Sequence, residues 1–303
     1  RYYGYSGTVP FRHLVYPLAG SGGLGIHLTL DLAGAARFGP DVAWIEAEDY
    51  GFDDAERDTF VDAILEGQPE PQMYFARMKR DNKMGAPVLG KLPAPQELTL
   101  RELEDVAQDE EAVILDTRLD RSAYMRHHIP GSLYAPFGKT FNTYVGSILE
   151  DETRPIVLLI DEEDVEEAVR DLVRIGYDNI AGFADIETLD RYFLEGGDTQ
   201  QIDEITFDDV DALVEDDANV VLDVRYKSEF DEEHIDGALN ASYTRIPEYA
   251  EDLPTDKTLL VHCATGRRAA VASSFLQKTG RDVKYINDVF ADRTTEKRTA
   301  AIA

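Results

Sequence analysis

The sequence contains a single cysteine, Cys263, among its 303 residues. One cysteine excludes an intramolecular disulfide bond, and it excludes a metal site built from several thiolates. Histidine is also scarce, and the six histidines include no His-x-His-x-Asp-His cluster of the kind that binds two metal ions. We therefore expect a protein that carries no metal ion and no other cofactor.

Long apolar runs are absent as well. No stretch has the length needed to span a bilayer, and no charged-then-apolar leader opens the sequence. These absences predict a cytoplasmic protein without a membrane partner. Hydrophobic residues nevertheless make up 43% of the chain, which predicts a globular protein with room for two domains of ordinary size or three small ones.

Basic residues are few. The chain has 30 of them, only nine of which are lysines, against 60 acidic residues, so its formal net charge is −30. A surface of this charge repels phosphate groups, and we therefore expect no nucleic-acid partner. Two explanations of the acid excess stay open. One is work in concentrated salt, where screening reduces self-repulsion, and the other is an ordinary acidic cytosolic protein.

The sequence repeats itself once after residue 97. Each copy has a short apolar run that ends in Asp-x-Arg, followed by His-Ile-x-Gly. The first copy has Asp116 and Arg118 at these positions, and the second has Asp223, Arg225 and, in the later motif, His234. Self-similarity over this length indicates two domains with the same fold.

Each copy continues with a second apolar run and a helical pattern that ends at a glycine, the expected helix stop. The apolar runs are residues 156–160 and 258–262, and the helical patterns are residues 165–175 and 269–279. Short buried strands that alternate with helices predict a mainly parallel sheet flanked by helices. We therefore expect two α/β domains, joined near Gly196.

Cys263 directly follows the second apolar run of the second copy, and a helix is expected just behind it. In this arrangement loop N–H groups and a helix N-terminus converge on one sulfur atom, with Arg267 and Arg268 beside it. Such surroundings stabilise a thiolate or an anionic persulfide. Gly266 lets the backbone curl without a side chain in the way. The alternative is a buried structural cysteine, and packing is the better explanation of His262.

The motifs of the repeat resemble those of tandem rhodanese-domain proteins over about residues 97–295. The resemblance implies that Cys263 takes a sulfane sulfur from thiosulfate or a persulfide, holds it as a cysteine persulfide, and passes it to a thiol or cyanide. It also implies small sulfur donors and thiol acceptors as partners. By the same resemblance the catalytic residues are Cys263 and Arg268, the substrate-binding residues are Ala264, Thr265, Gly266 and Arg267, and the supporting residues are Asp223, Arg225 and His234.

The first copy departs from this pattern at the position of the cysteine. Asp161 stands there, and it opens a run of four acidic residues, 161–164. Carboxylates suit a helix N-terminus but repel an anionic sulfur donor. We therefore expect residues 97–197 to be an inactive rhodanese-like domain and residues 202–295 to be the active one.

The second copy departs from the family pattern after its last strand. The family usually has a Gly-Gly-aromatic turn there, whereas this sequence has Tyr285 to Asp292. How the domain closes at this end stays open at the level of sequence.

The segment before the repeats resembles a third kind of domain. Residues 67–92 look like the tail of a metallo-β-lactamase-fold domain, which is fused to tandem rhodaneses in proteins that resemble persulfide dioxygenases. We interpret residues 58–96 as such a tail followed by a linker. The resemblance implies a metallo-β-lactamase-fold oxygenase as a partner.

The first residues resemble yet another family. Residues 13–17, 22–29 and 37–42 resemble part of the FAD-dependent 2-hydroxyacid oxidases, such as L-2-hydroxyglutarate dehydrogenase. We interpret residues 1–57 as a small β-rich fragment of this family, with an alternating, strand-like run before residue 31. Its glycines lack the Gly-x-Gly-x-x-Gly spacing of a dinucleotide site, so we expect no FAD.

Together these patterns predict a sulfurtransferase that works by double displacement through a Cys263 persulfide. One alternative is a non-catalytic rhodanese-like adaptor or sulfur carrier for a metallo-β-lactamase-fold persulfide dioxygenase. Another is the remnant of an FAD-dependent oxidoreductase. Turnover that depends on a thiol or cyanide would distinguish the first two, and a yellow purified protein would favour the third.

Overall fold

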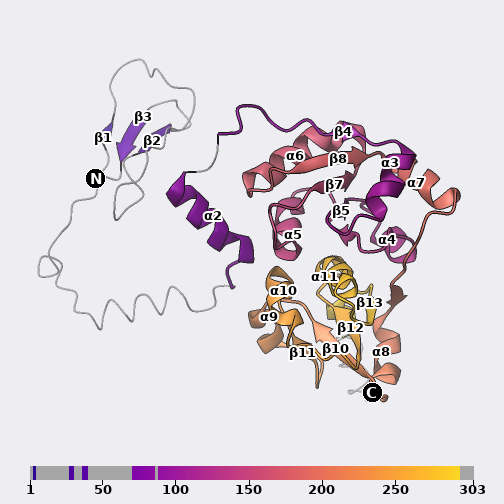
Figure 1. The fold of residues 1–303 in the computed structure, drawn as a ribbon. Helices are drawn as coiled ribbons and strands as arrows, with labels where there is room; N and C mark the ends of the chain where they lie inside the picture. Colours follow the sequence, from indigo (N-terminus) through magenta and orange to yellow (C-terminus); the bar gives the residue numbers. More distant parts are fainter. Residues whose placement is uncertain (1–2, 5–26, 31–35, 40–69, 86–87, 294–303) are drawn as a thin grey trace, which may run out of the picture. The chain divides into compact units, whose positions relative to one another are not determined.

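The computed structural model describes residues 3–4, 27–30, 36–39, 70–85 and 88–293 (Figure 1). The chain divides into two compact units, residues 1–68 and residues 69–303. In the first unit, β1 (Tyr3–Gly4), β2 (His27–Leu30) and β3 (Ala36–Gly39) form an antiparallel sheet in the order β1-β3-β2. β2 lies on the alternating run. Most of the residues that resemble FAD-dependent oxidases lie outside the described residues.

The first repeat forms a five-stranded sheet in the order β4-β8-β7-β5-β6, and all of its strands are parallel. Its elements are β4 (Gln96–Glu97), α3 (Leu100–Ala107), β5 (Val113–Asp116), α4 (Arg121–Arg126), β6 (Leu133–Tyr134), α5 (Phe141–Ile148), β7 (Ile156–Leu159), η2 (Glu162–Asp164), α6 (Val165–Arg174), β8 (Ile180–Ala184) and α7 (Ile186–Leu194). Every residue of β5 and β7 is buried, because helices cover both faces of the sheet.

The second repeat forms the same sheet from the same sequence of strands, in the order β11-β10-β12-β13-β9. Its elements are β9 (Asp203–Ile205), α8 (Phe207–Leu213), β10 (Asn219–Asp223), α9 (Lys227–Glu232), β11 (Leu239–Asn240), η3 (Tyr243–Arg245), α10 (Ile246–Ala250), β12 (Thr258–His262), α11 (Arg267–Lys278) and β13 (Val283–Ile286). The prediction of two parallel-sheet α/β domains with flanking helices is confirmed.

Local sequence explains how each repeat begins. The threonine before the first helix of each copy forms a reciprocal capping box with the acidic residue three positions later, Thr99 with Glu102 and Thr206 with Asp209. In the first copy the backbone N–H of Thr99 donates to Oε2 of Glu102 at 2.8 Å. Each box satisfies N–H groups that a helix N-terminus otherwise leaves without partners.

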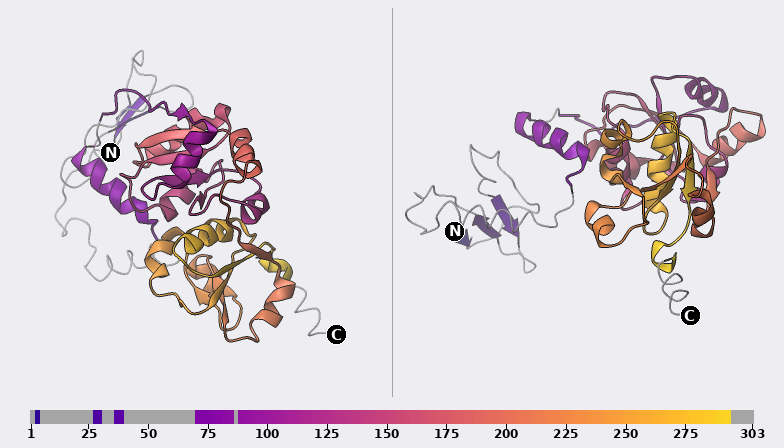
Figure 2. Two further views of the ribbon diagram at one scale, coloured as in Figure 1. Left: turned by 45° about the vertical axis from the view of Figure 1, so that its right-hand side comes forward. Right: turned by 90° about the horizontal axis from the view of Figure 1, so that it is seen from below.

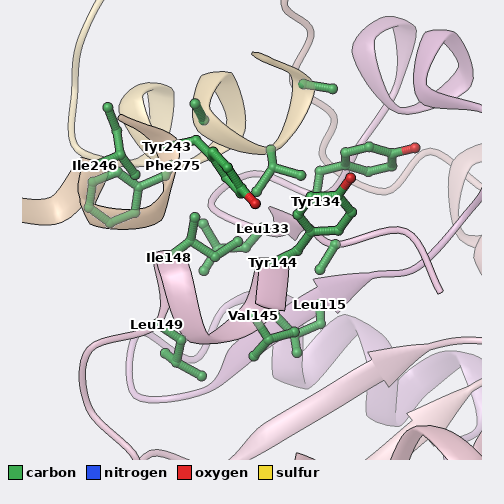
Figure 3. Packing of buried hydrophobic residues seen from close by; sticks show 14 of the residues in the cluster. Leu115, Leu133, Tyr134, Tyr144, Val145, Ile148, Leu149, Tyr243, Ile246 and Phe275 are labelled. Carbon is green, nitrogen blue, oxygen red and sulfur yellow. The ribbon is translucent and has the colours of Figure 1, made fainter. Parts of the chain in front are cut away.

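The two repeats share one hydrophobic core (Figures 2 and 3). The helix α5 of the first repeat packs against η3, α10 and α11 of the second. At this contact the rings of Tyr144 and Tyr243 have centroids 6.1 Å apart and cross at 64°. Polar contacts also join the repeats, since the backbone N–H of Tyr134 donates to Oγ of Ser274 at 3.0 Å.

The segment before the repeats also packs onto them. The helix α2 (Met73–Met84) buries Tyr74 and Arg77, and the guanidinium of Arg77 lies 4.3 Å from the centre of the Tyr177 ring. Arg77 also donates a hydrogen bond of 2.5 Å to the carbonyl of Ile175.

The helices α2 and α11 each have twelve residues. Among the described residues, no helix combines the length and the apolar character that crossing a bilayer would need.

Phe290 closes the second repeat at the end where the sequence departs from the family pattern. Its backbone N–H donates to the carbonyl of Ala264 at 3.0 Å, and its ring stacks on His262 with centroids 5.2 Å apart. The guanidinium of Arg225 lies 4.1 Å from the centre of the same ring. One aromatic side chain therefore ties this end of the domain to the loop after β12. Residues after Arg293 lie outside the described part of the chain.

Candidate active site

Cys263 lies at the carboxyl end of β12, the central strand of the second sheet. It is almost fully buried, with 1% of its surface exposed. The loop from Cys263 to Gly266 leads directly into α11, which begins at Arg267. Because the N-terminus of a helix carries unsatisfied N–H groups and a partial positive charge, this position favours a negatively charged sulfur atom.

Gly266 holds the loop in a conformation that no other residue adopts easily. Its φ angle is 82°, in the left-handed region. A Cβ atom at this position would lie 2.6 Å from Oη of Tyr285 and 3.1 Å from Oδ1 of Asn287. Both the backbone conformation and the lack of space therefore require glycine, and β13 fixes the path of the loop.

The loop keeps several backbone donors free. Within the part of the chain that the structure describes, the N–H groups of Ala264, Thr265 and Gly266 donate no hydrogen bond. Successive uncommitted amides in a tight turn form a concave surface that binds anions. These three N–H groups are among the loop donors that the sequence analysis expected near Cys263.

Arg268 is the second residue of α11, and its side chain is 18% exposed. Its two terminal nitrogens donate to the carboxylate of Glu229 at 2.6 and 2.8 Å. Burial by itself lowers the pKa of Arg268, but its hydrogen bonds to Glu229 and the nearby Cys263 outweigh burial, so this pKa lies above its ordinary value. Arg268 therefore stays charged, within electrostatic reach of Cys263.

Asp223 and Arg225 form a buried pair at the end of β10. Arg225 Nη2 donates to Oδ2 of Asp223 at 2.6 Å and to the carbonyl of Glu233 at 2.6 Å. In the first repeat the corresponding arginine makes the corresponding bonds, at 2.7 and 2.8 Å. Because both repeats keep this pair, whatever their loops contain, its contacts serve the strand end and the following helix.

His262 is fully buried beside this pair. Its ring packs against those of Phe290 and Phe207, whose centroids are 5.2 and 5.5 Å away. Burial lowers the pKa of His262 to about 4, although Asp223 opposes the shift. The side chain is therefore neutral at pH 7, and its 3.6 Å approach to Asp223 is not an ion pair.

The remaining predicted residues lie on the surface. Thr265 and Arg267 are exposed, and Arg267 forms no hydrogen bond or ion pair with the rest of the described chain. His234 is exposed too. Its Nδ1 lies 2.8 Å from the carbonyl oxygen of Phe230, and the two rings stack with centroids 4.0 Å apart.

Comparison with family models identifies both repeats. The model described as "Rhodanese-like domain" matches residues 99–185 and 206–291, which is more than half of the chain. The chain belongs to the rhodanese-like family. The tandem rhodanese resemblance is therefore confirmed.

Two curated relatives match shorter parts of this rhodanese-like protein. Thiosulfate sulfurtransferase GlpE of Coxiella burnetii is 34% identical over 61 residues, which are 20% of this chain and 57% of the relative. Mitochondrial L-2-hydroxyglutarate dehydrogenase of Arabidopsis thaliana is 60% identical over 40 residues, which are 13% of this chain and 8% of the relative. The chain thus spans less than two thirds of either relative.

Among solved structures, a metallo-β-lactamase from Staphylococcus aureus has 26% sequence identity to this chain and a TM-score of 0.35. The match covers 42% of this chain and 33% of that one. At this TM-score the likeness carries no argument about fold or function.

The first rhodanese-like repeat has a different loop at the position of the site. Asp161 stands two residues after the end of β7, and the residue before α6 is Asp164, with a φ angle of −95° in place of the left-handed glycine. Glu166 stands where the second repeat has Arg268. The loop therefore has no sulfur, and it has negative charge where the second repeat has positive charge.

The structure adds residues that sequence reasoning missed. Glu229 belongs to α9, and Tyr285 belongs to β13. Arg121 comes from the first repeat, and its Cζ would lie 3.3 Å from a Cβ at Gly266. No spacing rule links these residues to Cys263, because only the packing of distant elements brings them to the loop.

Proposed function

We propose that this protein is a rhodanese-type sulfurtransferase. Cys263 accepts a sulfane sulfur from thiosulfate or a persulfide and passes it to a thiol or cyanide. The observation that carries the proposal is the position of the only cysteine, at the end of the central strand and directly before a helix N-terminus. Free loop amides and a charged Arg268 surround that position.

The proposed reaction has two steps that balance without an oxidant or a reductant. The thiolate of Cys263 attacks the outer sulfur of thiosulfate, the S–S bond of the donor breaks, and sulfite leaves with the electron pair. A new S–S bond makes the cysteine persulfide. A thiolate or cyanide then attacks the terminal sulfur, the S–S bond on Cys263 breaks, and the cysteine thiolate is restored. Transfer between thiolates needs little proton movement.

Each part of the loop has a role in this proposal. The amides of Ala264, Thr265 and Gly266 and the N-terminus of α11 stabilise the anionic persulfide. Arg268 adds a fixed positive charge, and Arg267 at the surface attracts the donor. The other predicted residues, Asp223, Arg225 and His234, hold the elements that flank the loop. The first repeat is not a second catalyst, because its acidic loop carries no nucleophile.

Intact-mass spectrometry tests the proposal. The full chain is incubated with thiosulfate or glutathione persulfide, beside the variant Cys263→Ser. We expect the parent protein to gain the mass of one sulfur atom, to lose it on treatment with cyanide, and to do so only when Cys263 is present.

Two results would contradict this function. The absence of an adduct with either donor would favour the non-catalytic adaptor, which binds a metallo-β-lactamase-fold oxygenase or another partner. If Cys263→Ser gained as much sulfur as the parent protein, the sulfur would be bound elsewhere than in the loop after β12.

A further inference from the structure

The helix α4 of the first repeat reaches the sulfur-binding loop of the second. It lies against β9 and α11, on the side of the first repeat that faces the second (Figure 1). Arg121 opens this helix, and its guanidinium carbon would lie 3.3 Å from a Cβ at Gly266. A cation from the repeat without a cysteine is therefore in contact range of the loop that contains Cys263.

The charge of Arg121 has no partner. Within the described part of the chain, the side chain of Arg121 forms no hydrogen bond and no ion pair, although it is half-buried. Other arginines near the ends of the strands are engaged, since Arg118 binds Asp116 and Arg268 binds Glu229. A half-buried guanidinium without a protein partner has all of its donors available for an anion.

Polar contacts fix the surroundings of Arg121. Asn287 donates from Nδ2 to Oγ of Ser122 at 3.1 Å, and so joins the end of β13 to α4. The hydroxyl of Tyr285 donates to Oδ1 of Asn287 at 3.0 Å. These bonds hold the start of α4, where Arg121 lies, against the end of β13.

The charges of Arg121 and Cys263 both act on the buried hydroxyl of Tyr285. Burial raises the pKa of Tyr285, the charge of Arg121 opposes the shift, and the charge of Cys263 adds to it. The guanidinium and the sulfur are thus both within electrostatic reach of the same group. A small donor that presents its sulfane sulfur to Cys263 brings its anionic group into the same region.

We propose that Arg121 binds the anionic group of the sulfur donor, so that the inactive repeat completes the substrate site of the active one. This inference rests on the proposed sulfurtransferase function. The chemistry it selects is a sulfane sulfur attached to a negatively charged group, either the sulfonate-like end of thiosulfate or a carboxylate of a persulfide. Arg121 neutralises that group in the bound donor and takes no part in breaking bonds.

Steady-state kinetics with three donors test this role in the full chain. The donors are thiosulfate, glutathione persulfide and 2-mercaptoethanol persulfide, whose only charge is on its sulfur. We expect Arg121→Ala to raise KM about tenfold for at least one of the two charged donors, with kcat changed less than about twofold. KM for 2-mercaptoethanol persulfide should stay unchanged. If KM rises for thiosulfate alone, Arg121 binds its sulfonate-like end. If KM rises for glutathione persulfide alone, Arg121 binds a carboxylate.

Two matched variants make the result specific. Arg126→Ala removes an exposed arginine of the same helix and should leave every KM unchanged. Arg121→Lys keeps the positive charge but lacks the planar guanidinium group. We expect it to bind the charged donor more tightly than Arg121→Ala does and less tightly than the parent protein.

The outcomes separate this inference from the function on which it rests. If the parent protein and Arg126→Ala transfer no sulfur at all, the proposed function fails. If both are active and Arg121→Ala keeps the parent KM for thiosulfate and for glutathione persulfide, only the role of Arg121 is overturned. An equal loss with all three donors would also overturn it, because a purely structural defect does not discriminate by charge.

Discussion

Arg268 donates two hydrogen bonds, of 2.6 and 2.8 Å, to the carboxylate of Glu229, and these bonds join α11 to α9. Burial raises the pKa of Glu229, but the bonds and the charge of Arg268 outweigh burial and bring this pKa below its ordinary value. The pair is therefore fully ionised at neutral pH. Glu229 therefore holds in place a cation that is within electrostatic reach of Cys263.

A double-variant cycle on this pair has a definite expected result. Arg268→Ala should slow persulfide formation from thiosulfate about 100-fold, because it removes a stabilising charge and leaves an unpaired carboxylate near the donor. Removing Glu229 as well should recover about tenfold, because the two residues act as a unit. Single-turnover rates measure both effects. A double variant slower than Arg268→Ala would mean that Glu229 assists the reaction directly.

Gly266→Ala should destabilise the protein and stop sulfur loading. The left-handed backbone costs about 1–2 kcal/mol for any residue with a Cβ. A further cost comes from Oη of Tyr285, which lies 2.6 Å from the new atom. Gly237→Ala is the matched control, because Gly237 has a similar φ of 79° and no atom within 4 Å of an added Cβ. Urea unfolding should show the larger loss for Gly266→Ala, and equal losses would refute the steric argument.

His262 should make stability depend on pH between 4 and 6.5. Burial holds the pKa of His262 at about 4, whereas the unfolded chain takes up this proton near pH 6.5. The unfolded state therefore binds more protons in this window, so stability falls as the pH is lowered through it. The parent protein should lose about 3 kcal/mol more than His262→Phe between pH 7 and pH 4. Identical losses in urea titrations at the two pH values would contradict this assignment.

Salt should stabilise the protein strongly if the acid excess is an adaptation to concentrated salt. The net charge of −30 implies self-repulsion in the folded state, which screening reduces. We expect Tm to rise by at least about 5 °C between 0.1 M and 2 M potassium chloride. A globular protein of similar size and near-zero net charge is the control. A Tm that does not rise more than that of the control would favour an ordinary acidic protein.

Local patterns predicted the secondary structure of the repeats well, because short apolar runs and glycine stops are encoded within a few residues. The helix expected over residues 165–175 is α6 (Val165–Arg174). The helix expected from residue 269 begins two residues earlier, at Arg267. Arg267 and Arg268 carry no apolar periodicity, so the pattern could not include them, although the left-handed Gly266 before them starts the helix.

Most of the partners that shape the site could not be predicted in this way. Phe290 replaces the turn usual in the family by stacking on His262, a contact between two residues on different segments. Glu229 is an ordinary acidic residue in an acidic sequence, and nothing in its neighbourhood marks it as the partner of Arg268. Such pairs depend on how helices pack on the sheet, which a linear pattern does not contain.

The sequence by itself determined that this chain has one cysteine, that a strand, a short loop and a helix surround it, and that the other copy lacks it. These features are contiguous, so residue types and spacing suffice to find them. Only the tertiary structure decided which positive charges are free. Glu229 engages Arg268, whereas Arg121 arrives unpaired from the other repeat, because the shared core packs α4 against α11 and so places two distant residues side by side.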